Sequence, residues 1–374
     1  MNILILNWKD ILHPQVGGAE IIVYELAKRL VRNGHQVTWF CRSFKNGSPS
    51  ETIDGINVVR RGNLFTMYFF AVLYYWSLSP KPDLVIDISN TIYWQTPLWA
   101  WGSKKVAYLN QVAQDVFFYE YPLLISRLGI FFERLQYLTY HHTPFLCYSN
   151  STKEDLVSLG VPRDHIQTFS LGMDHNRYFP SRKSSIPLFI CVNRLVRMKR
   201  TDLVIQAMVI VNQSFPNARL VIVGTGYDRP RLEKLRHDLH LQSAVTFADK
   251  NTWFFQKNPK DAKVKLMQQA WALIFPSVKE GWGMTVTECA ACATPAIVAA
   301  VSGLKDSVID NQTGLILSPN PPPAEIAEAM ISLIKNPKLR QKLYRQATIY
   351  SQKFSWDKSY REFYEHLNAI LAGT

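Results

Sequence analysis

Two glutamates with seven residues between them, Glu280 and Glu288, flank a glycine-rich turn in the second half of the chain. A carboxylate accepts hydrogen bonds well from sugar hydroxyl groups. The apolar run 270–275 before the turn is typical of a buried parallel strand, and residues 284–292 have the composition of a helix. We therefore place Glu280 in the turn and Glu288 in the helix, where the pair can hold opposite ends of one elongated ligand. Two such glutamates alone would more often be solvated surface residues, and the turn between them favours a site.

The turn also predicts a site for an anion. The first N–H groups of a helix have no partner inside the helix and carry a partial positive charge, so they bind phosphate groups. The residues expected to contribute to this site are Gly281, Trp282, Gly283, Met284 and Thr285.

A basic run, residues 193–200, follows the first strand of the second half. Arg194 can bind a phosphate through two hydrogen bonds, and Lys199 supplies a compact positive charge. Such a run alone is more often a solvated face or a nucleic-acid contact. At a strand end in the same domain as the helix start, it predicts half of a diphosphate site. No two aspartates stand at DxD spacing, so we expect cations of the protein, and no metal, to neutralise the diphosphate.

Two further glycine pairs are weaker signals. Gly17 and Gly18 lie between an apolar strand and a helix, where backbone N–H groups can approach a ligand at the carboxyl edge of a sheet. Gly224 and Gly226 resemble the start of a dinucleotide-binding motif, but Arg229 replaces its third glycine. This substitution disfavours a dehydrogenase.

Short apolar strands alternate with helical segments along the whole chain, which predicts two right-handed βαβ series with parallel sheets. The polar linker 181–185 separates them, and the boundary is expected near 172–186. The strands are expected at 1–7, 36–40, 56–59, 84–88, 105–109 and 145–148, and then at 188–192, 219–223, 245–247, 271–275 and 296–301.

Composition limits the classes of function. A chain of 374 residues is large enough for two domains, and its net charge of +13 implies anionic partners such as nucleotide phosphates, an acidic membrane surface or nucleic acid. The basic residues are spread over both halves instead of alternating with aromatics on one element, which disfavours an oligonucleotide-binding protein. The five scattered cysteines and the absence of a signal sequence at the amino terminus lead us to expect a cytoplasmic protein.

Two apolar segments have more than one interpretation. The stretch 64–78 is about five residues short of a membrane-spanning helix. A second stripe has helical spacing and comprises Leu124, Leu128, Phe131, Phe132, Leu135 and Leu138. We expect the second stripe to belong to a core helix, and 64–78 to be either a core helix or one that dips into an interface. A peripheral contact with the inner face of a membrane is the alternative, because the chain is strongly basic.

Together these motifs resemble the retaining GT-B glycosyltransferases of the group 1 or family 4 type. The matching pieces are Gly17-Gly18-Ala19-Glu20, Arg194 with Lys199, Val223-Gly224-Thr225-Gly226 and Glu280-x7-Glu288; residues 171–174 and 354–356 resemble two further family segments. The resemblance implies two Rossmann-like domains that face a cleft. Residues 1–175 would bind the acceptor, residues 186–353 would bind the nucleotide-sugar, and a helix in 354–374 would cross back to the first domain.

The resemblance also assigns roles. Glu280 would orient the sugar hydroxyls and Glu288 would accept hydrogen bonds from the ribose, while Arg194 and Lys199 would stabilise the leaving diphosphate. Asn110 stands where many relatives carry a histidine that touches the donor sugar. Lys250 lies in a segment that shapes the base pocket, where relatives often have a glycine.

The expected reaction is metal-independent transfer of a hexose to a saccharide or lipid-linked acceptor in envelope or exopolysaccharide biosynthesis. The only small-molecule partner expected besides the acceptor is the donor, with no separate cofactor and no nucleic acid. UDP-glucose is the first choice of donor. GDP-mannose is the second, because Asp249 could read a guanine.

Overall fold

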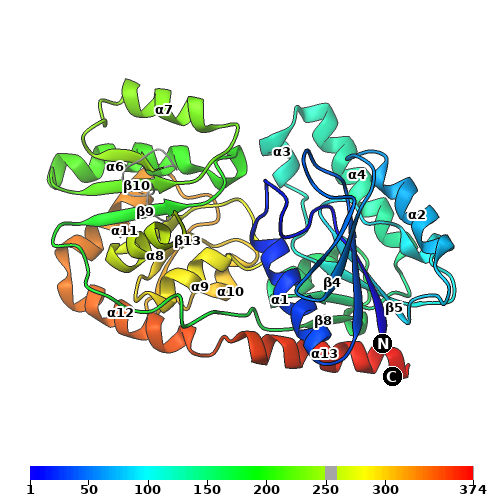
Figure 1. Ribbon diagram of the computed structural model, residues 1–374. Coiled ribbons are helices and arrows are strands. Elements are labelled where there is room, and N and C mark those ends of the chain that lie inside the picture. Colours follow the sequence, from blue (N-terminus) through cyan, green and yellow to red (C-terminus); the bar gives the residue numbers. More distant parts are fainter. Residues whose placement is uncertain (249–258, 374) are drawn as a thin grey trace. The chain divides into compact units, whose positions relative to one another are not determined.

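The computed structural model describes residues 1–248 and 259–373, and the chain divides into two compact units (Figure 1). The first unit comprises residues 1–114, 127–172 and 356–374, and the second comprises 115–126 and 173–355. The segment 115–126 thus interrupts the expected first domain, 1–175. It joins the second unit because the Glu120 carboxylate accepts hydrogen bonds from the Met198 N–H, at 2.9 Å, and from the Tyr227 hydroxyl.

An eight-stranded sheet forms the centre of the first unit, in the order β3-β4-β2-β1-β5-β6-β7-β8. All neighbouring strands are parallel except β3 and β4. The strands are β1 (Asn2–Leu6), β2 (Gln36–Cys41), β3 (Ser50–Ile53), β4 (Ile56–Arg60), β5 (Leu84–Ser89), β6 (Lys104–Leu109), β7 (Phe145–Cys147) and β8 (Ile166–Thr168). The helices of this part of the chain are α1 (Gly18–Arg32), α2 (Met67–Ser77), α3 (Val116–Glu120), α4 (Leu123–Thr139), α5 (Asn150–Ser158) and α13 (Trp356–Ala372).

The two faces of this sheet carry different helices. Helix α13 lies beside α1 (Figure 1), and Arg29 of α1 pairs with Asp357 of α13 at 3.2 Å. On the opposite face, α2 packs in a cluster with Leu4, Leu6 and Val85, and α4 packs in a cluster with Ala107 and Leu109. The strand register pairs Leu4 with Val85, and Asp87 with Ala107. Because side chains alternate along a strand, α2 and α4 cover the same face of the sheet.

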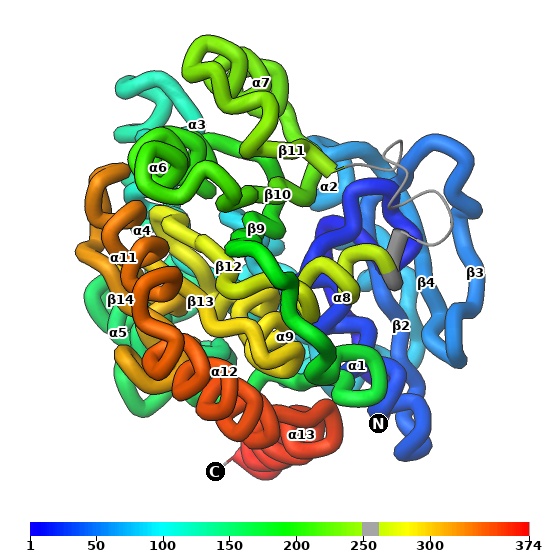
Figure 2. The backbone as a smooth tube through the Cα atoms, turned by 90° about the vertical axis from the view of Figure 1, so that its left-hand side faces the viewer, coloured from blue at the N-terminus to red at the C-terminus, as the bar shows by residue number. Residues whose placement is uncertain are grey.

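A six-stranded, fully parallel sheet forms the second unit, in the order β11-β10-β9-β12-β13-β14 (Figure 2). Its strands are β9 (Leu188–Val192), β10 (Arg219–Val223), β11 (Val245–Ala248), β12 (Ala272–Phe275), β13 (Ala296–Ala299) and β14 (Gly314–Leu317). Its helices are α6 (Thr201–Ser214), α7 (Arg229–Asp238), α8 (Pro259–Gln269), α9 (Met284–Ala291), α10 (Leu304–Ser307), α11 (Pro323–Lys335) and α12 (Pro337–Ser351). Apolar side chains fill both faces of this sheet, as a buried parallel sheet requires.

Every strand predicted from the sequence is present to within two residues at each end. Three strands were not predicted: β3, β8 and β14. Each of them has only three or four residues. All three lie at the edge of a sheet and bury at most one residue each, so they lack the apolar run by which the other strands were predicted.

The prediction that the stripe on α4 is buried is wrong. Its six apolar residues are 46% to 72% exposed, with Leu124 and Leu138 at the upper limit. The buried side of α4 instead carries polar and aromatic residues that bond to the loops below. Gln136 accepts a hydrogen bond from the Tyr93 N–H at 3.0 Å, and the Tyr140 hydroxyl donates to the buried Asp87. These hydrogen bonds turn the leucine and phenylalanine stripe outward.

The stretch 64–78 forms α2, which buries only Met67, Ala71 and Tyr75. These positions follow each other at four-residue spacing, so one narrow side of the helix meets the sheet. The interpretation of this stretch as a core helix is therefore confirmed only for the side that carries these three residues. Among the described residues, no helix combines the length and the hydropathy that crossing a bilayer requires.

Candidate functional site

The carboxyl edge of the second sheet carries the turn that the sequence singled out. Strand β12 ends at Phe275, α9 begins at Met284, and Glu280 lies in the turn between them. The Glu280 N–H donates to the Ser302 carbonyl at 3.2 Å. A Cβ atom at Gly303 would lie 2.2 Å from the Glu280 carbonyl oxygen, and Gly303 has φ +80°. Only glycine allows this close approach, so Gly303 fixes the turn.

Sequence reasoning missed Gly303. Its signal was present in the sequence, because a strand, a glycine and a helix also follow one another at β13, Gly303 and α10. The same pattern had drawn attention to the turn after β12. Two neighbouring strands of the sheet therefore supply the two backbones that meet at Glu280.

The structure brings together two of the predicted site residues, Lys199 and Glu280. Lys199 ends a short 3-10 helix, Arg197–Lys199, after β9, and its ammonium group forms an ion pair with the Glu280 carboxylate. The two side chains are only 9% and 12% exposed. The Val278 N–H donates to the Met198 carbonyl at 2.9 Å and joins the two loops. This pair places one positive and one negative charge beside the start of α9.

The amino terminus of α9 has no side chain that caps it. Gly283 is the N-cap residue, with φ +90° in the left-handed region, and it offers no side-chain oxygen. Trp282 instead donates from its indole N–H to Thr287 Oγ1 at 2.8 Å, and its ring packs against Phe354. The N–H groups of Met284 and Thr285 therefore lie at an uncapped helix end, which suits an anion.

Gly224 and Gly226 permit the close packing of two loops. A Cβ atom at Gly224 would lie 1.9 Å from the Asn193 carbonyl oxygen, and one at Gly226 would lie 2.1 Å from the Leu195 carbonyl oxygen. The Leu195 N–H also donates to the Thr225 carbonyl at 2.9 Å. These contacts fix the loop that carries Arg194, whose side chain is exposed. The close packing of these loops thus explains why both positions are glycine, without a bound dinucleotide.

The structure does not pair Glu288 with Glu280. The buried Glu288 carboxylate accepts a hydrogen bond from the Tyr178 hydroxyl at 2.8 Å and pairs with the Lys263 ammonium group at 2.7 Å. Burial, together with the neighbouring Glu288 charge, raises the pKa of Tyr178. Each carboxylate oxygen retains capacity to accept another hydrogen bond. No sequence pattern pointed to Tyr178 or Lys263.

In the first unit, Gly17 and Gly18 stand at the start of α1, as predicted, and the Gly17 N–H is already bonded within the chain. The Gly17 N–H donates to a Glu20 carboxylate oxygen at 2.7 Å, and the other oxygen of Glu20 lies 3.2 Å from the Lys9 ammonium group. Glu20 is buried. The chain thus satisfies the N–H of the N-cap residue with its own carboxylate, while no side chain caps the N–H groups of the first helical turn.

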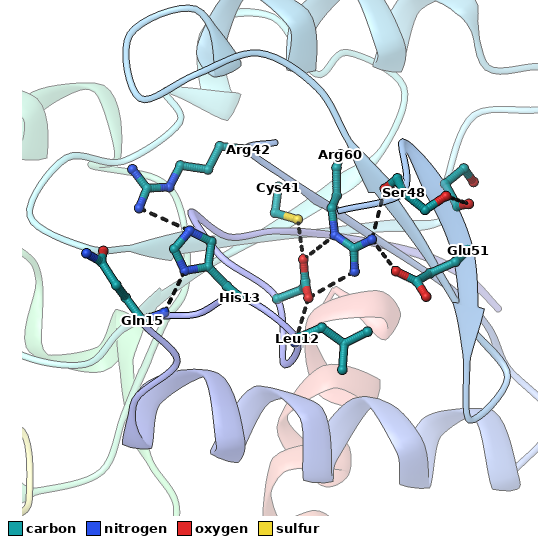
Figure 3. Close-up of polar contacts among 10 residues, drawn as sticks. Leu12, His13, Gln15, Cys41, Arg42, Ser48, Glu51 and Arg60 are labelled. Atoms are coloured by element: carbon teal, nitrogen blue, oxygen red, sulfur yellow. Dashed lines mark hydrogen bonds and ion pairs between the residues drawn. The ribbon is translucent and has the colours of Figure 1, made fainter. Parts of the chain in front are cut away.

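A buried network supports the loop between β1 and α1 (Figure 3). Arg60, at the end of β4, donates two hydrogen bonds to Asp10, at 2.6 and 3.1 Å, and pairs with Glu51. The Cys41 thiol donates to the same carboxylate at 3.2 Å. Burial opposes the charge of Asp10, but the hydrogen bonds from Arg60, the Leu12 N–H and Cys41 hold its pKa below the usual value. Burial and the neighbouring Asp10 raise the pKa of the Cys41 thiol.

His13 occupies the same loop. Its Nδ1 accepts the Gln15 N–H at 3.0 Å, and its Nε2 lies 3.3 Å from a guanidinium nitrogen of Arg42 (Figure 3). Burial lowers the pKa of His13, and the positive charges of Arg42 and Lys9 lower it further. The ring is therefore a neutral, structural acceptor in this loop. No sequence pattern indicated this network, because its members come from four separate segments.

Asn110 follows β6 in the first unit, and its amide is held on both sides. The Tyr148 hydroxyl donates to Asn110 Oδ1 at 3.2 Å, and Asn110 Nδ2 donates to the Ser89 carbonyl at 3.4 Å. Lys250 and Asp249, which were expected near the base, lie outside the described residues.

Curated relatives of this chain include an uncharacterized glycosyltransferase of Methanocaldococcus jannaschii, which is 26% identical over 97% of this chain and 96% of that protein. A D-inositol 3-phosphate glycosyltransferase of Acidothermus cellulolyticus is 30% identical over 54% of this chain, and that match covers 47% of the relative.

Solved structures show the same fold. A sucrose-phosphate synthase from Thermosynechococcus elongatus superposes with a TM-score of 0.81 at 20% identity, with both chains fully covered. HepE of Anabaena, solved with UDP-glucose, has a TM-score of 0.75 at 18% identity over 99% of this chain and 100% of its own. The two parallel-sheet units and these similarities identify the GT-B fold.

Two family models match consecutive parts of the chain. The model described as Glycosyltransferase Family 4 matches residues 16–177, and the model described as Glycosyl transferases group 1 matches residues 176–349. The first match begins at Val16, next to Gly17, and the second contains Lys199, Glu280 and Glu288. The chain is therefore an enzyme of the group 1 or family 4 glycosyltransferases.

Proposed function

We propose that the chain transfers a hexose from a nucleoside-diphosphate sugar, with UDP-glucose as first choice, to a saccharide or lipid-linked acceptor. The reaction would retain the configuration of the anomeric carbon, need no metal, and serve envelope or exopolysaccharide biosynthesis on the cytoplasmic side of the membrane. One observation carries the proposal: the Lys199–Glu280 pair stands beside the uncapped amino terminus of α9.

The roles follow from where charge develops. When the bond between the anomeric carbon and the diphosphate breaks, the leaving diphosphate gains negative charge and the sugar gains positive charge. The N–H groups of Met284 and Thr285, with Arg194 and Lys199, would stabilise the diphosphate, because donors held in place for a developing charge lower the barrier. These cations would take the part that a metal plays in other transferases.

The Glu280 carboxylate would orient the sugar hydroxyls. Its backbone is fixed by Ser302 and Gly303, and one of its oxygens already faces Lys199. The remaining acceptor sites of this carboxylate are available to the hexose. Glu288 would accept from the ribose while it keeps its bonds to Tyr178 and Lys263.

The choice of UDP-glucose rests on similarity. HepE was solved with UDP-glucose, and TarM was solved with UDP. A thermal-shift panel of UDP-, GDP-, ADP- and TDP-sugars tests it, because a ligand that binds the native state raises the melting temperature.

We expect the UDP-sugars to give the largest shift, and donor hydrolysis without acceptor to be fastest with UDP-glucose. Adding EDTA should leave that rate unchanged. A clear preference for GDP-mannose would overturn the choice of donor and point to Asp249 as the base reader. A strict requirement for magnesium or manganese would contradict the cationic site.

A further inference from the structure

An extensive apolar surface covers one side of the first unit. We define the α2–α4 surface as the exposed apolar side chains of α2, of α4 from residue 127 onward, and of the segments beside them. They are 42% to 84% exposed. The members are Phe65, Phe69, Leu73, Trp76, Leu98, Trp101, Leu128, Phe131, Phe132, Leu135 and Leu138.

These residues form one surface because α2 and α4 lie on the same face of the sheet, with their outer sides turned away from it. The segment 91–101 fills the space between the helices. Trp101 from this segment stacks on Trp76 of α2, with ring centroids 6.4 Å apart. On its other side, Gln95 accepts a hydrogen bond from Thr139 of α4 at 2.7 Å. Monomeric proteins rarely expose so large an apolar patch without a partner.

The charges around this surface are almost all positive. The segments that build it, residues 61–82, 91–105 and 127–142, contain six basic residues and one acidic residue, Glu133. Glu133 is buried and accepts hydrogen bonds from the Ala113 and Gln114 N–H groups at 2.6 and 2.8 Å. The basic residues are Arg61, Lys81, Lys104, Lys105, Arg127 and Arg134. Lys104 lies near Gly373 on the opposite face, so the other five belong to this surface, and these three segments contribute no exposed carboxylate to it.

We propose that the α2–α4 surface binds the interfacial region of an anionic lipid bilayer. Tryptophan and phenylalanine side chains favour the boundary between headgroups and acyl chains, and arginine and lysine side chains are attracted to anionic headgroups. A second copy of the chain fits the surface less well. It would bring arginines against arginines, with no exposed carboxylate to pair with them.

This inference goes beyond the donor site, and it matches the lipid-linked acceptor of the proposed function. The two can fail separately, because vesicle binding is measured without donor, whereas donor hydrolysis is measured without lipid. A protein that binds vesicles but hydrolyses no donor would keep this inference and refute the proposed function.

Flotation with vesicles tests the inference directly. Neutral phosphatidylcholine vesicles are compared with vesicles that contain phosphatidylglycerol, in about 0.05 M and about 0.5 M NaCl. We expect binding to the anionic vesicles at low salt, weaker binding at high salt, and roughly tenfold weaker binding to neutral vesicles.

Two double variants separate the apolar and the charge contributions. Phe131→Ser with Phe132→Ser should abolish insertion, and Arg127→Gln with Arg134→Gln should weaken binding to anionic vesicles about tenfold. All four side chains are exposed, so the variants should keep the parent's melting temperature and donor hydrolysis. Ile349→Ser, and Lys338→Gln with Lys342→Gln, make comparable changes at exposed positions of the second unit and should change nothing.

Sedimentation velocity without lipid completes the test, and we expect a monomer. No binding of the parent to anionic vesicles at low salt would overturn the inference. A dimer that Phe131→Ser with Phe132→Ser dissociates, together with absent vesicle binding, would assign the surface to a second copy.

Discussion

Two helix starts in this protein have similar sequences and opposite environments. In the first unit, α1 begins after Gly17, and no side chain caps its first turn, but the Glu20 carboxylate accepts the Gly17 N–H and places a negative charge of the chain at this helix start. In the second unit, α9 begins after Gly283, with no side chain that caps it, and the nearby Glu280 pairs with Lys199 instead. Both starts follow a strand at the carboxyl edge of a parallel sheet. The start of α1 thus holds a carboxylate that bonds to its N-cap residue, whereas the N-cap residue of α9, Gly283, has no such bond to a side chain.

The comparison shows how to tell structural charges from functional ones. Around α1, the ionic groups are buried and each has several protein partners, as the pairing of Arg60 with Asp10 and Glu51 shows. Around α9, Arg194 is exposed, and within the described residues its guanidinium group has no ion-pair partner. Charges that already satisfy each other stabilise a loop. Charges that remain partly available are suited to bind a substrate.

The largest effect on stability should come from Asp10→Asn. The Arg60 and Asp10 side chains are fully buried, and Asp10→Asn leaves the Arg60 charge with Glu51 as its remaining carboxylate partner. We expect the free energy of unfolding to fall by about 3–5 kcal/mol in chemical denaturation. Asp238→Asn, which breaks an exposed pair with Lys234, is the matched control and should cost less than about 1 kcal/mol. A stable Asp10→Asn enzyme that loses transfer would make this loop part of the active site.

Glu280→Gln should have the largest effect on catalysis. The amide keeps a hydrogen-bond acceptor for Lys199 but loses the charge that orients the sugar hydroxyls. We expect kcat to fall on the order of 10²–10³-fold, with the thermal shift produced by the donor nearly unchanged. Glu233→Gln, in the pair with Arg229 on α7, controls for loss of a carboxylate in the same unit. If Glu280→Gln turns over like the parent, Glu280 does not contact the sugar.

Arg194→Ala should weaken donor binding without loss of stability. The side chain is exposed, so the unliganded protein does not depend on it. A lost hydrogen bond to a charged phosphate corresponds to about a tenfold to hundredfold rise in Kd, measured by titration calorimetry with UDP.

Arg182→Ala, at an exposed position of the linker, is the control for the loss of a positive charge. Lys199→Met should weaken binding as well and should also lower stability, because it leaves the Glu280 carboxylate unpaired. Equal affinity for UDP in the parent and in Arg194→Ala would remove Arg194 from the donor site.

The smallest effect should be a pH dependence in the first unit. Burial lowers the pKa of His13 below its ordinary value of 6.5, so the unfolded chain binds a proton at a higher pH than the folded one. Its contribution to stability is therefore complete above pH 6.5 and is lost as the pH falls through the folded pKa. His13→Gln should flatten the fall in unfolding free energy between pH 7.5 and 5.5. His35, whose pKa burial also lowers, retains part of the slope. A slope unchanged in His13→Gln would contradict this assignment.

Local patterns predicted five of the six strands of the second unit, all except β14, and the turn after β12. Apolar runs of four to six residues, ended by Pro276 or a glycine, locate a buried strand and the turn that follows. They also placed Glu280 outside the helix and Glu288 inside it. Partners that are distant in sequence left no such pattern: Tyr178 and Glu288 are separated by 110 positions, and Asp10 and Arg60 by 50.

The exposed stripe on α4 shows a second limit of sequence reasoning. Helical spacing reveals that a helix has two different sides, but it does not reveal which side is buried. Here the buried side is polar and aromatic, and Gln136 on it accepts a hydrogen bond from the Tyr93 N–H. Without knowledge of those partners, the leucine and phenylalanine side was the reasonable choice for the core.

Hydrogen exchange with and without UDP tests most directly whether the open helix start holds the donor. If the N–H groups at the start of α9 bind the diphosphate, peptides that cover residues 281–287 should exchange more slowly when UDP is added. Peptides that cover the start of α1, residues 17–21, should retain their exchange rate, because the Gly17 N–H already donates a hydrogen bond to Glu20. Unchanged exchange at 281–287, with slower exchange at 17–21, would contradict the account and move the anion site to the first unit.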